Sequence, residues 1–256
     1  MSGPERVAAV TGATSGIGRA IAVRLAENAA VAVAGRNEAE GRATVETITE
    51  RGGIASFTRL DVTDAAAVDA WIDGAIQEYG RLDWLVNNAG MNGATARLED
   101  YGIEEFELIV RTNLLGAFYT VHRAIPVMRA QGCGSIVNIG STASLQGYGL
   151  LSGYTASKHG LLGLTRAVAL ENADVPIRVN CVCPGPVDTP LMQGVERLVN
   201  PDDPGLARKL FEETTALKRY GTPEEIAELV AFLLGSSAGY ITGTAISIDG
   251  GVMTGV

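Results

Sequence analysis

The sequence predicts an α/β fold in which helices cover both faces of a parallel β-sheet. Short apolar stretches alternate with helical stretches from the beginning of the chain to its end. The apolar stretches contain few polar residues, which is typical of parallel strands that are buried on both faces. A glycine-rich turn also joins the first strand to the first helix, as in doubly wound sheets.

The alternating elements can be assigned in chain order from their hydrophobic patterns. The predicted strands cover residues 6–12, 30–35, 54–62, 82–90, 134–141, 175–185 and 244–251. The predicted helices cover residues 16–29, 38–51, 64–79, 104–132, 154–173 and 223–235. The first helix shows the expected spacing, because Ile17, Ile21 and Leu25 recur on one face. There is no internal repeat and no linker, so we expect one domain over residues 1–256.

Local signals mark two of the helix starts and one irregular segment. Asn37, followed three residues later by Glu40, predicts an N-cap with its capping partner. Thr222-Pro223-Glu224-Glu225 predicts a capped helix with proline at its first position. The segment at about 186–216 is rich in Pro, Asp and Gly. We interpret it as an irregular, mobile flap over the substrate rather than a domain boundary.

Composition excludes several classes of function. The formal net charge of -9 argues against nucleic acid or an anionic membrane as a partner. Cys133, Cys181 and Cys183 fit neither a disulfide framework nor a zinc site, and His122 and His159 lack acidic or cysteine neighbours at ligand spacing. We therefore expect no metal. The sequence shows no signal peptide and no apolar run that could span a bilayer, so we expect a cytoplasmic protein.

The glycine-rich turn predicts a dinucleotide site. Gly12, Gly16 and Gly18 lie between the first strand and the first helix, where backbone N–H groups and the helix dipole can receive a pyrophosphate. The second strand then ends in Gly35 and Arg36 rather than in the acid that holds a ribose 2′-hydroxyl. Because a guanidinium suits a 2′-phosphate, Arg36 favours NADP. NAD remains open, since Ser15 in the turn adds no second cation.

Several further motifs resemble the short-chain dehydrogenase/reductase family along nearly the whole chain. They are Thr11-Gly12-x-x-x-Gly16-x-Gly18, Asp61-Val62, Asn87-Asn88-Ala89-Gly90, Asn113, Ser141, Tyr154-x-x-x-Lys158, Pro184-Gly185 and the closing YITGTAISIDGG. The resemblance implies a Rossmann-like doubly wound domain with a seven-stranded parallel sheet. It also implies hydride transfer between a nicotinamide and an alcohol or ketone, in a homotetramer or homodimer.

The resemblance assigns roles to individual residues. The catalytic set corresponds to Asn113, Ser141, Tyr154 and Lys158. The implied cofactor-binding residues are Gly12, Ser15, Gly16, Ile17, Gly18, Arg36, Asp61, Val62, Asn87, Ala89, Gly90, Tyr154, Lys158, Pro184, Gly185, Val187 and Thr189. Among these, Asp61 and Val62 are expected at the adenine, Asn87 and Gly90 at the adenosine ribose, and Thr189 at the carboxamide.

A tyrosine four residues before a lysine suits proton transfer. Tyr154 and Lys158 share one helix face, so a cation lies beside a phenol whose free pKa is near ~10. At ~4 Å and an effective dielectric near ~20, a unit charge contributes about 4 kcal/mol. We therefore expect Lys158 to lower the pKa of Tyr154 toward neutrality. Ser141 then orients the substrate oxygen, and Asn113 anchors a water that links Lys158 to solvent.

The substrate is less closely defined by the sequence. The expected substrate-binding residues are Ser141, Gln146, Tyr148, Leu151, Tyr154, Pro186 and Met192, with Gln146 as the clearest polar group. This set predicts a medium-sized, fairly apolar ketone or secondary alcohol. A 3-oxoacyl-[acyl-carrier-protein] reductase is the main alternative, although an acidic carrier needs a basic entrance that is hard to find here. A polyol or sugar dehydrogenase and a non-catalytic nucleotide-binding regulator are further alternatives.

Overall fold

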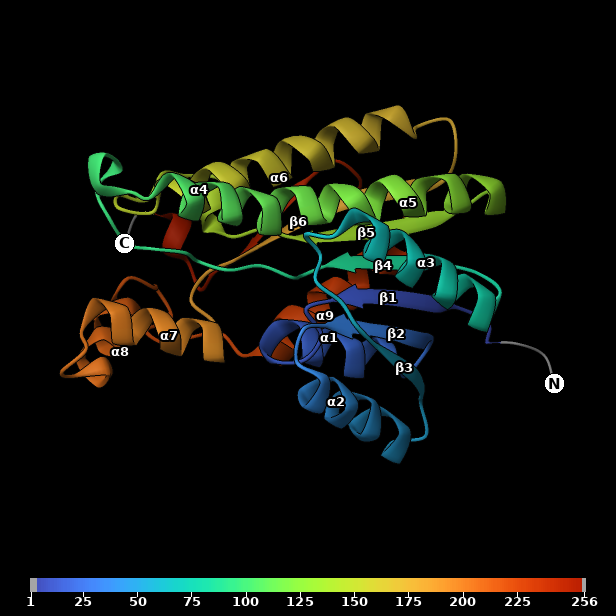
Figure 1. Cartoon of the computed structure of the whole chain (residues 1–256), viewed down its shortest axis with the longest axis horizontal. Coiled ribbons are helices and arrows are strands. Elements are labelled where there is room, and N and C mark those ends of the chain that lie inside the picture. The colour runs from blue at the N-terminus through green and yellow to red at the C-terminus, as the bar shows by residue number, and fades with distance from the viewer. Residues whose placement is uncertain (1–3, 255–256) are drawn as a thin grey trace.

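The computed structural model describes residues 4–254 and confirms the doubly wound α/β fold (Figure 1). Seven parallel strands form one sheet in the order β3-β2-β1-β4-β5-β6-β7. The strands are β1 (Val7–Thr11), β2 (Ala30–Gly35), β3 (Ile54–Arg59), β4 (Trp84–Asn87), β5 (Gly134–Ile139), β6 (Ile177–Pro184) and β7 (Ala245–Ile248). The strand order reverses between β1 and β4, where ligands bind in folds of this kind.

Helices cover both faces of the sheet. They are α1 (Gly16–Leu25), α2 (Glu38–Glu50), α3 (Ala65–Tyr79), α4 (Ile103–Val110), α5 (Gly116–Gln131), α6 (Ser152–Glu171), α7 (Pro190–Val199), α8 (Pro204–Glu213) and α9 (Pro223–Leu234). Successive residues of the buried strands point to opposite faces of the sheet and pack against different helices. In β1, Val10 packs with α1 and α9, whereas Ala9 packs with α3 and α5. This accounts for the apolar character of the central strands.

The helix starts follow the local chemistry of the sequence. The side chain of Asn37 accepts the Glu40 N–H at 3.3 Å, as predicted, but the Glu40 carboxylate pairs with Arg19 instead of completing a capping box. Thr222 and Glu225 do form the predicted capping box at α9. The first helix ends at Leu25, four residues earlier than expected.

The segment at 186–216 is not irregular. It contains α7 and α8, each with a side-chain N-cap, Thr189 or Asp203, followed by proline at the first helical position. These are ordinary helix-start signals that the turn-like composition concealed. No helix within residues 4–254 combines the length and the apolar character needed to cross a bilayer.

Two glycines provide a matched test of this packing. A Cβ at Gly18 would lie 2.3 Å from both the Gly12 carbonyl oxygen and Asn88 Nδ2, whereas a Cβ at Gly74 in α3 would meet nothing within 4 Å. We expect Gly18→Ala to destabilise the fold by about 1–3 kcal/mol through overpacking. Gly74→Ala should stabilise it by about 0.5–1 kcal/mol, because glycine is a poor residue in a helix interior.

Denaturant unfolding of both variants measures the two changes. A Gly18→Ala protein as stable as the wild type would contradict the close approach of the turn to Asn88.

Candidate active site

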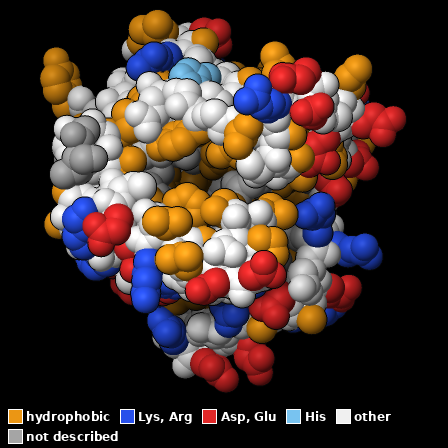
Figure 2. Space-filling model, turned by 90° about the vertical axis from the view of Figure 1, so that its left-hand side faces the viewer, with side chains coloured by type: hydrophobic (Ala, Val, Ile, Leu, Met, Phe, Trp, Pro, Cys, Tyr) orange, Lys and Arg blue, Asp and Glu red, His pale blue; other side chains and the backbone are white. Residues whose placement is uncertain are grey.

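A cleft of about 480 Å³ opens at the carboxyl ends of β1, β2 and β4. Figure 2 looks onto this side of the molecule, which is hollowed and has hydrophobic side chains around the hollow. The cleft is lined by Gly12, Thr14, Ser15, Gly16, Ile17, Gly35, Arg36, Asn37, Leu60, Asp61, Val62, Asn88, Ala89, Gly90, Thr112, Thr189, Pro190 and Leu191.

The turn after β1 is held in place by the end of β4. Gly12 and Gly16 adopt positive φ angles of 62° and 51°, which side chains with a Cβ rarely adopt. Asn88 Nδ2 donates to the carbonyl oxygens of Thr11 and Gly12, at 3.2 and 3.0 Å, and Thr11 Oγ1 accepts the N–H of Asn88. The two strands on either side of the switch point therefore fix the turn together.

The N-terminus of α1 presents free donors to this cleft. Its N-cap, Ser15, makes no side-chain capping bond, and its first turn contains no acidic residue. The first N–H groups of a helix lack partners within the helix, and the dipole adds positive charge there. This end of the cleft therefore suits an anion such as a phosphate.

Arg36 lies at the far side of the same cleft. A Cβ at Gly35 would lie 2.5 Å from Thr14 Cγ2, so an acidic side chain does not fit at position 35. The neighbouring Arg19 and Arg42 pair with Glu40 and Glu38, whereas within residues 4–254 no carboxylate lies within 4.0 Å of Arg36. The Arg36 guanidinium is thus available to a ligand.

Asn113 lies in a π-helical segment, Arg111–Leu115, that joins α4 to α5. Its Oδ1 accepts the Met91 N–H at 2.8 Å, and its Nδ2 donates to the Met91 carbonyl at 2.9 Å and to Ser157 Oγ at 3.1 Å. It also faces Gly90, where a Cβ would lie 3.2 Å from Asn113 Oδ1 and 3.6 Å from Lys158 Nζ. Single π-turns of this kind occur at functional sites.

Ser141 follows β5 and caps a short 3₁₀ turn, Thr142–Ser144. Its Oγ accepts the Ala143 N–H at 3.1 Å, and its own N–H donates to Ser144 Oγ at 3.2 Å. The capping bond uses a lone pair of the Ser141 hydroxyl and leaves its proton free. Ser141 can therefore donate a hydrogen bond to an oxygen in front of it.

Lys158 is buried beside this turn, with 5% of its surface exposed. Its Nζ donates to the Ile139 carbonyl, the last of β5, at 2.8 Å and lies 5.7 Å from the centre of the Tyr154 ring. Burial lowers the pKa of Lys158 to about 8. Lys158 therefore keeps most of its charge at neutral pH.

The expected effect on Tyr154 is not found. Burial raises the pKa of the Tyr154 hydroxyl above its ordinary value, and the hydroxyl of Ser141 offsets only part of that rise. The ammonium of Lys158 points to the Ile139 carbonyl rather than to the phenol. In this state Tyr154 is a neutral phenol that holds its proton, which suits a proton donor.

Not all of the expected cofactor residues line the cleft. Gly12, Ser15, Gly16, Ile17, Arg36, Asp61, Val62, Ala89, Gly90 and Thr189 do, whereas Gly18, Asn87, Tyr154, Lys158, Pro184, Gly185 and Val187 do not. Asn87 is buried in the sheet, where it bonds to Asn138 and Thr120. Val187 is buried in the core, and Gly185 gives space to Asp249, whose Cα would lie 2.8 Å from a Cβ there.

Eight residues line the cleft without being among the expected binding residues: Thr14, Gly35, Asn37, Leu60, Asn88, Thr112, Pro190 and Leu191. Thr14 lies between two glycines of the motif and Asn88 inside the quoted Asn87-Asn88 pair, so position within the motif could have identified both. Thr112 has no comparable signal.

The loop expected to bind substrate is partly occupied with its own contacts. Gln146 Nε2 donates to the Tyr148 hydroxyl at 2.8 Å, and Thr142 Oγ1 lies 2.8 Å from the same oxygen. Tyr148 lines a separate surface hollow with Ser152, Thr155 and His159. Leu151, Pro186 and Met192 line neither hollow, while Leu191 lines the cleft. Within residues 4–254 there is no cluster of three or more metal-ligating side chains.

Comparison with known proteins identifies the family. The family profile described as enoyl-(acyl carrier protein) reductase matches residues 12–253. Levodione reductase of Leifsonia aquatica is 39% identical over 252 residues, which cover 96% of this chain and 94% of the relative. A solved structure of a levodione reductase has a TM-score of 0.96 at 37% identity, and the match covers 99% of both chains. The chain belongs to the short-chain dehydrogenase/reductase family.

Two further members of the family are similar over nearly their whole length. Cyclohexanol dehydrogenase of an Acinetobacter species is 37% identical over 252 residues, covering 96% of this chain and 94% of the relative. A solved variant of actinorhodin polyketide ketoreductase with NADPH has a TM-score of 0.93 at 38% identity and covers 96% and 97% of the two chains. This chain is therefore an oxidoreductase that uses a nicotinamide cofactor and acts on hydroxyl or carbonyl groups of a small molecule.

The residues present fit a dinucleotide. Glycines at positions 12 and 16 with positive φ, an uncapped helix N-terminus and a free arginine line one continuous cleft. Together they offer backbone donors for a pyrophosphate and a cation for a further phosphate.

The buried charge of Lys158 leads to a stability prediction. Its pKa falls from 10.5 to about 8 on folding, so burial of the cation costs free energy below pH 8, and this cost disappears as the pH rises toward 10.5. We expect Lys158→Met to raise Tm at pH 7. The free energy of unfolding should increase by up to about 3 kcal/mol, minus the contribution of the lost hydrogen bond to Ile139. The gain should shrink between pH 8 and pH 10.5.

Thermal unfolding at pH 7 and pH 9.5 measures the effect, and exposed Lys209→Met is the control. A Tm increase of equal size at both pH values would mean that charge burial is not its cause.

Proposed function

We propose that this protein is an NADP-preferring reductase and dehydrogenase for medium-sized, apolar ketones and the corresponding secondary alcohols. One observation carries the proposal. Ser141 with a free hydroxyl proton, a Tyr154 that holds its proton and a buried Lys158 lie together beside a cleft that suits a dinucleotide.

The side chains of the chain perform the proton part of the reaction. The nicotinamide cofactor, when bound, supplies the hydride that adds to the carbonyl carbon. Tyr154 donates its hydroxyl proton to the carbonyl oxygen, so that the ketone becomes an alcohol, and it takes the proton back in the oxidation. Ser141 donates a hydrogen bond to the same oxygen and stabilises the charge that develops there.

Lys158 and Asn113 restore and stabilise this arrangement. With a pKa of about 8, Lys158 remains an ammonium at neutral pH, bonded to the Ile139 carbonyl and 5.7 Å from the centre of the Tyr154 ring. When a cofactor is bound, its ribose hydroxyls would be further acceptors for Lys158. Asn113, fixed by Met91 and Ser157, faces the same Gly90 as Lys158, which supports a role in holding a water for proton exchange with solvent.

Arg36 supports the preference for NADP over NAD. It follows β2 and has no carboxylate within 4.0 Å in residues 4–254, and Thr14 occupies the space that a side chain at position 35 would need. The similar ketoreductase structure also contains NADPH.

The substrate class is supported by the mouth of the cleft and by the relatives. Leu191 lines the cleft and is 49% exposed. One relative is named for cyclohexanol, a ring alcohol, and another for levodione. We infer an apolar ring ketone or alcohol as the preferred substrate.

A ketone carried on an acyl carrier protein is the second candidate, since a putative ketoacyl reductase of Streptomyces virginiae is 41% identical. The α4 side of the molecule argues against it. Its first turn carries Glu104 and Glu105, beside Leu98 and Ile103, which are both more than 70% exposed. An acidic carrier would be repelled there.

The domain organisation is also part of the proposal. We infer one domain over residues 1–256, in which α7 and α8 are the substrate flap.

We also infer that the protein forms a homotetramer or homodimer in the cytoplasm. Exposed Leu108, Leu115 and Phe118 along α4 and α5 support self-association, because such apolar side chains on adjacent helices favour a partner surface.

Steady-state assays with cyclohexanone, a linear ketone and a ketoacyl thioester, each with NADPH and NADH, test the function. We expect the ring ketone with NADPH to be reduced fastest. Arg36→Leu should lower kcat/KM with NADPH by about 10-fold or more, the size of a lost charge-assisted phosphate contact, and leave NADH nearly unchanged.

Arg42→Leu is the matched control, because Arg42 is an exposed arginine that pairs with Glu38. If only the ketoacyl thioester were reduced, the second candidate function would replace the first. No turnover of any ketone or alcohol would refute both.

A further inference from the structure

The helical flap, defined as α7, α8 and the loop between them (residues 190–213), makes few apolar contacts with the rest of the molecule. α7 buries only Glu196 and α8 only Ala207 among their described side chains. Leu191, Leu198 and Leu210 are each about half exposed or more, and the two helices pack mainly on each other. Apolar burial therefore contributes little to fixing the flap over the cleft.

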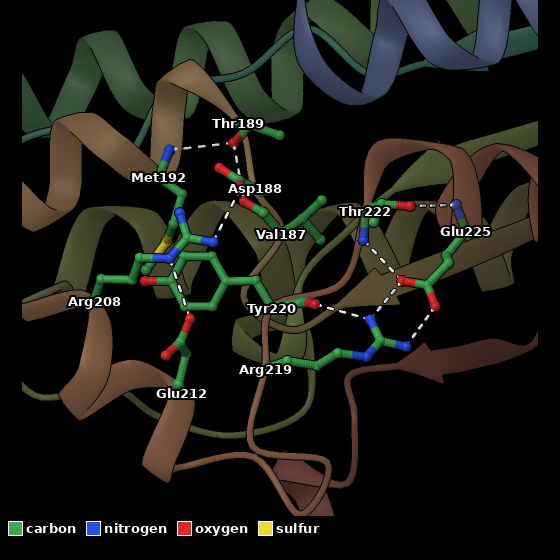
Figure 3. A network of polar contacts seen from close by, with 10 residues as sticks. All are labelled: Val187, Asp188, Thr189, Met192, Arg208, Glu212, Arg219, Tyr220, Thr222 and Glu225. Carbon is green, nitrogen blue, oxygen red and sulfur yellow. Dashed lines mark hydrogen bonds and ion pairs between the residues drawn. The ribbon is translucent and has the colours of Figure 1, made fainter. Parts of the chain in front are cut away.

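Arg208 of α8 connects the flap to both chain segments that join it to the sheet (Figure 3). Its Nη2 donates to Asp188 Oδ2 at 2.9 Å, on the segment that enters the flap. Its guanidinium lies 4.5 Å from the centre of the Tyr220 ring, on the segment that leaves the flap. Its Nε donates to Glu212 Oε1 at 3.1 Å, which orients the guanidinium plane along α8.

The two connecting segments form a firm base for this contact. The Asp188 N–H donates to the Gly221 carbonyl at 3.0 Å, and the Gly221 N–H to the Pro186 carbonyl at 2.9 Å. Tyr220 is 4% exposed. Arg219, beside it, makes a two-pronged ion pair with Glu225 of α9, at 2.7 and 2.9 Å, on the body of the molecule (Figure 3).

The same base leads directly into the cleft. Asp188 precedes Thr189, whose Oγ1 accepts the Met192 N–H at 3.2 Å and so begins α7. Thr189 and Leu191 both line the cleft. The carboxylate that Arg208 contacts therefore lies directly before the flap residues that line the cleft.

We propose that Arg208 is a positioning residue for the reaction, whose ion pair with Asp188 and stacking on Tyr220 hold the flap in the arrangement that binds cofactor and substrate. The proposal rests on the proposed function for the identity of the cofactor. A planar guanidinium is needed, since it can pair with a carboxylate and stack on a ring at once, which an ammonium does less well.

Four variants test this role: Arg208→Gln, Arg208→Lys, Asp188→Asn and the double variant Arg208→Gln/Asp188→Asn. Arg219→Gln is the matched control, because it breaks an ion pair on the same base without touching the flap. The readouts are the rate of proteolytic cleavage within residues 190–213, the dissociation constant of NADPH by fluorescence, KM and kcat for a ketone, and Tm.

We expect Arg208→Gln to accelerate flap cleavage and weaken NADPH binding, each about 5-fold, as for the loss of one partly exposed ion pair. KM should rise with kcat changed by less than about 2-fold. Asp188→Asn should act in the same way, the double variant no more strongly than either single one, and Arg208→Lys should be intermediate. Arg219→Gln should lower Tm without changing flap cleavage.

Equal effects of Arg208→Gln and Arg219→Gln on flap cleavage and NADPH binding would overturn the proposal, as would full additivity in the double variant. Failure of the proposed function gives a different result. In that case the wild type does not bind NADPH, while the cleavage rates still report whether Arg208 holds the flap.

Discussion

The burial of one ammonium group determines how this site is built. Lys158 is nearly inaccessible and is held by the last carbonyl of β5. A buried cation is costly unless it is hydrogen-bonded, and it persists here at the edge of the sheet where β5 ends. Three other residues lie around this position: Gly90 faces both Lys158 and Asn113, Asn113 lies in the π-helical segment, and Ser141 begins the 3₁₀ turn that follows β5.

Two groups of residues lie along the same edge of the sheet, one suited to binding a cofactor and one suited to proton transfer. Toward β1 and β2, the glycine turn, the uncapped start of α1 and the free Arg36 offer positive groups without side-chain bulk. Toward β5, the polar side chains are already bonded to one another, so that Ser141 retains one free proton and Tyr154 keeps its own. The groups proposed for cofactor binding and those proposed for proton transfer thus follow different strands of one parallel sheet.

The sequence predicts the elements well wherever local chemistry decides them. The strands, the Asn37 cap and the Thr222 capping box depend on neighbouring residues, and the structure contains them. The π-helical turn at Asn113 has no sequence signal, because it arises from packing between α4, α5 and α6. The sequence does not predict α7 and α8, because Pro and Asp are typical both of turns and of helix starts.

The pKa of Tyr154 could not be deduced from sequence spacing. Four residues along a helix bring the lysine near the phenol, but burial of both groups and the bond of Lys158 to Ile139 decide the direction. Asn87 is a similar case, since its motif does not reveal that its amide bonds to Asn138 inside the sheet. In both cases a hydrogen bond to a residue outside the motif determines what the side chain does.

The central claim is that Tyr154 transfers the proton, and single-turnover reduction by the Tyr154→Phe variant tests it most directly. Phenylalanine keeps the ring and removes only the hydroxyl. The account predicts that the rate of hydride transfer falls by about 10²–10⁴-fold, the usual contribution of a positioned acid, while NADPH binding stays within about 2-fold of the wild type. A variant that reduces the ketone at the wild-type rate would contradict it.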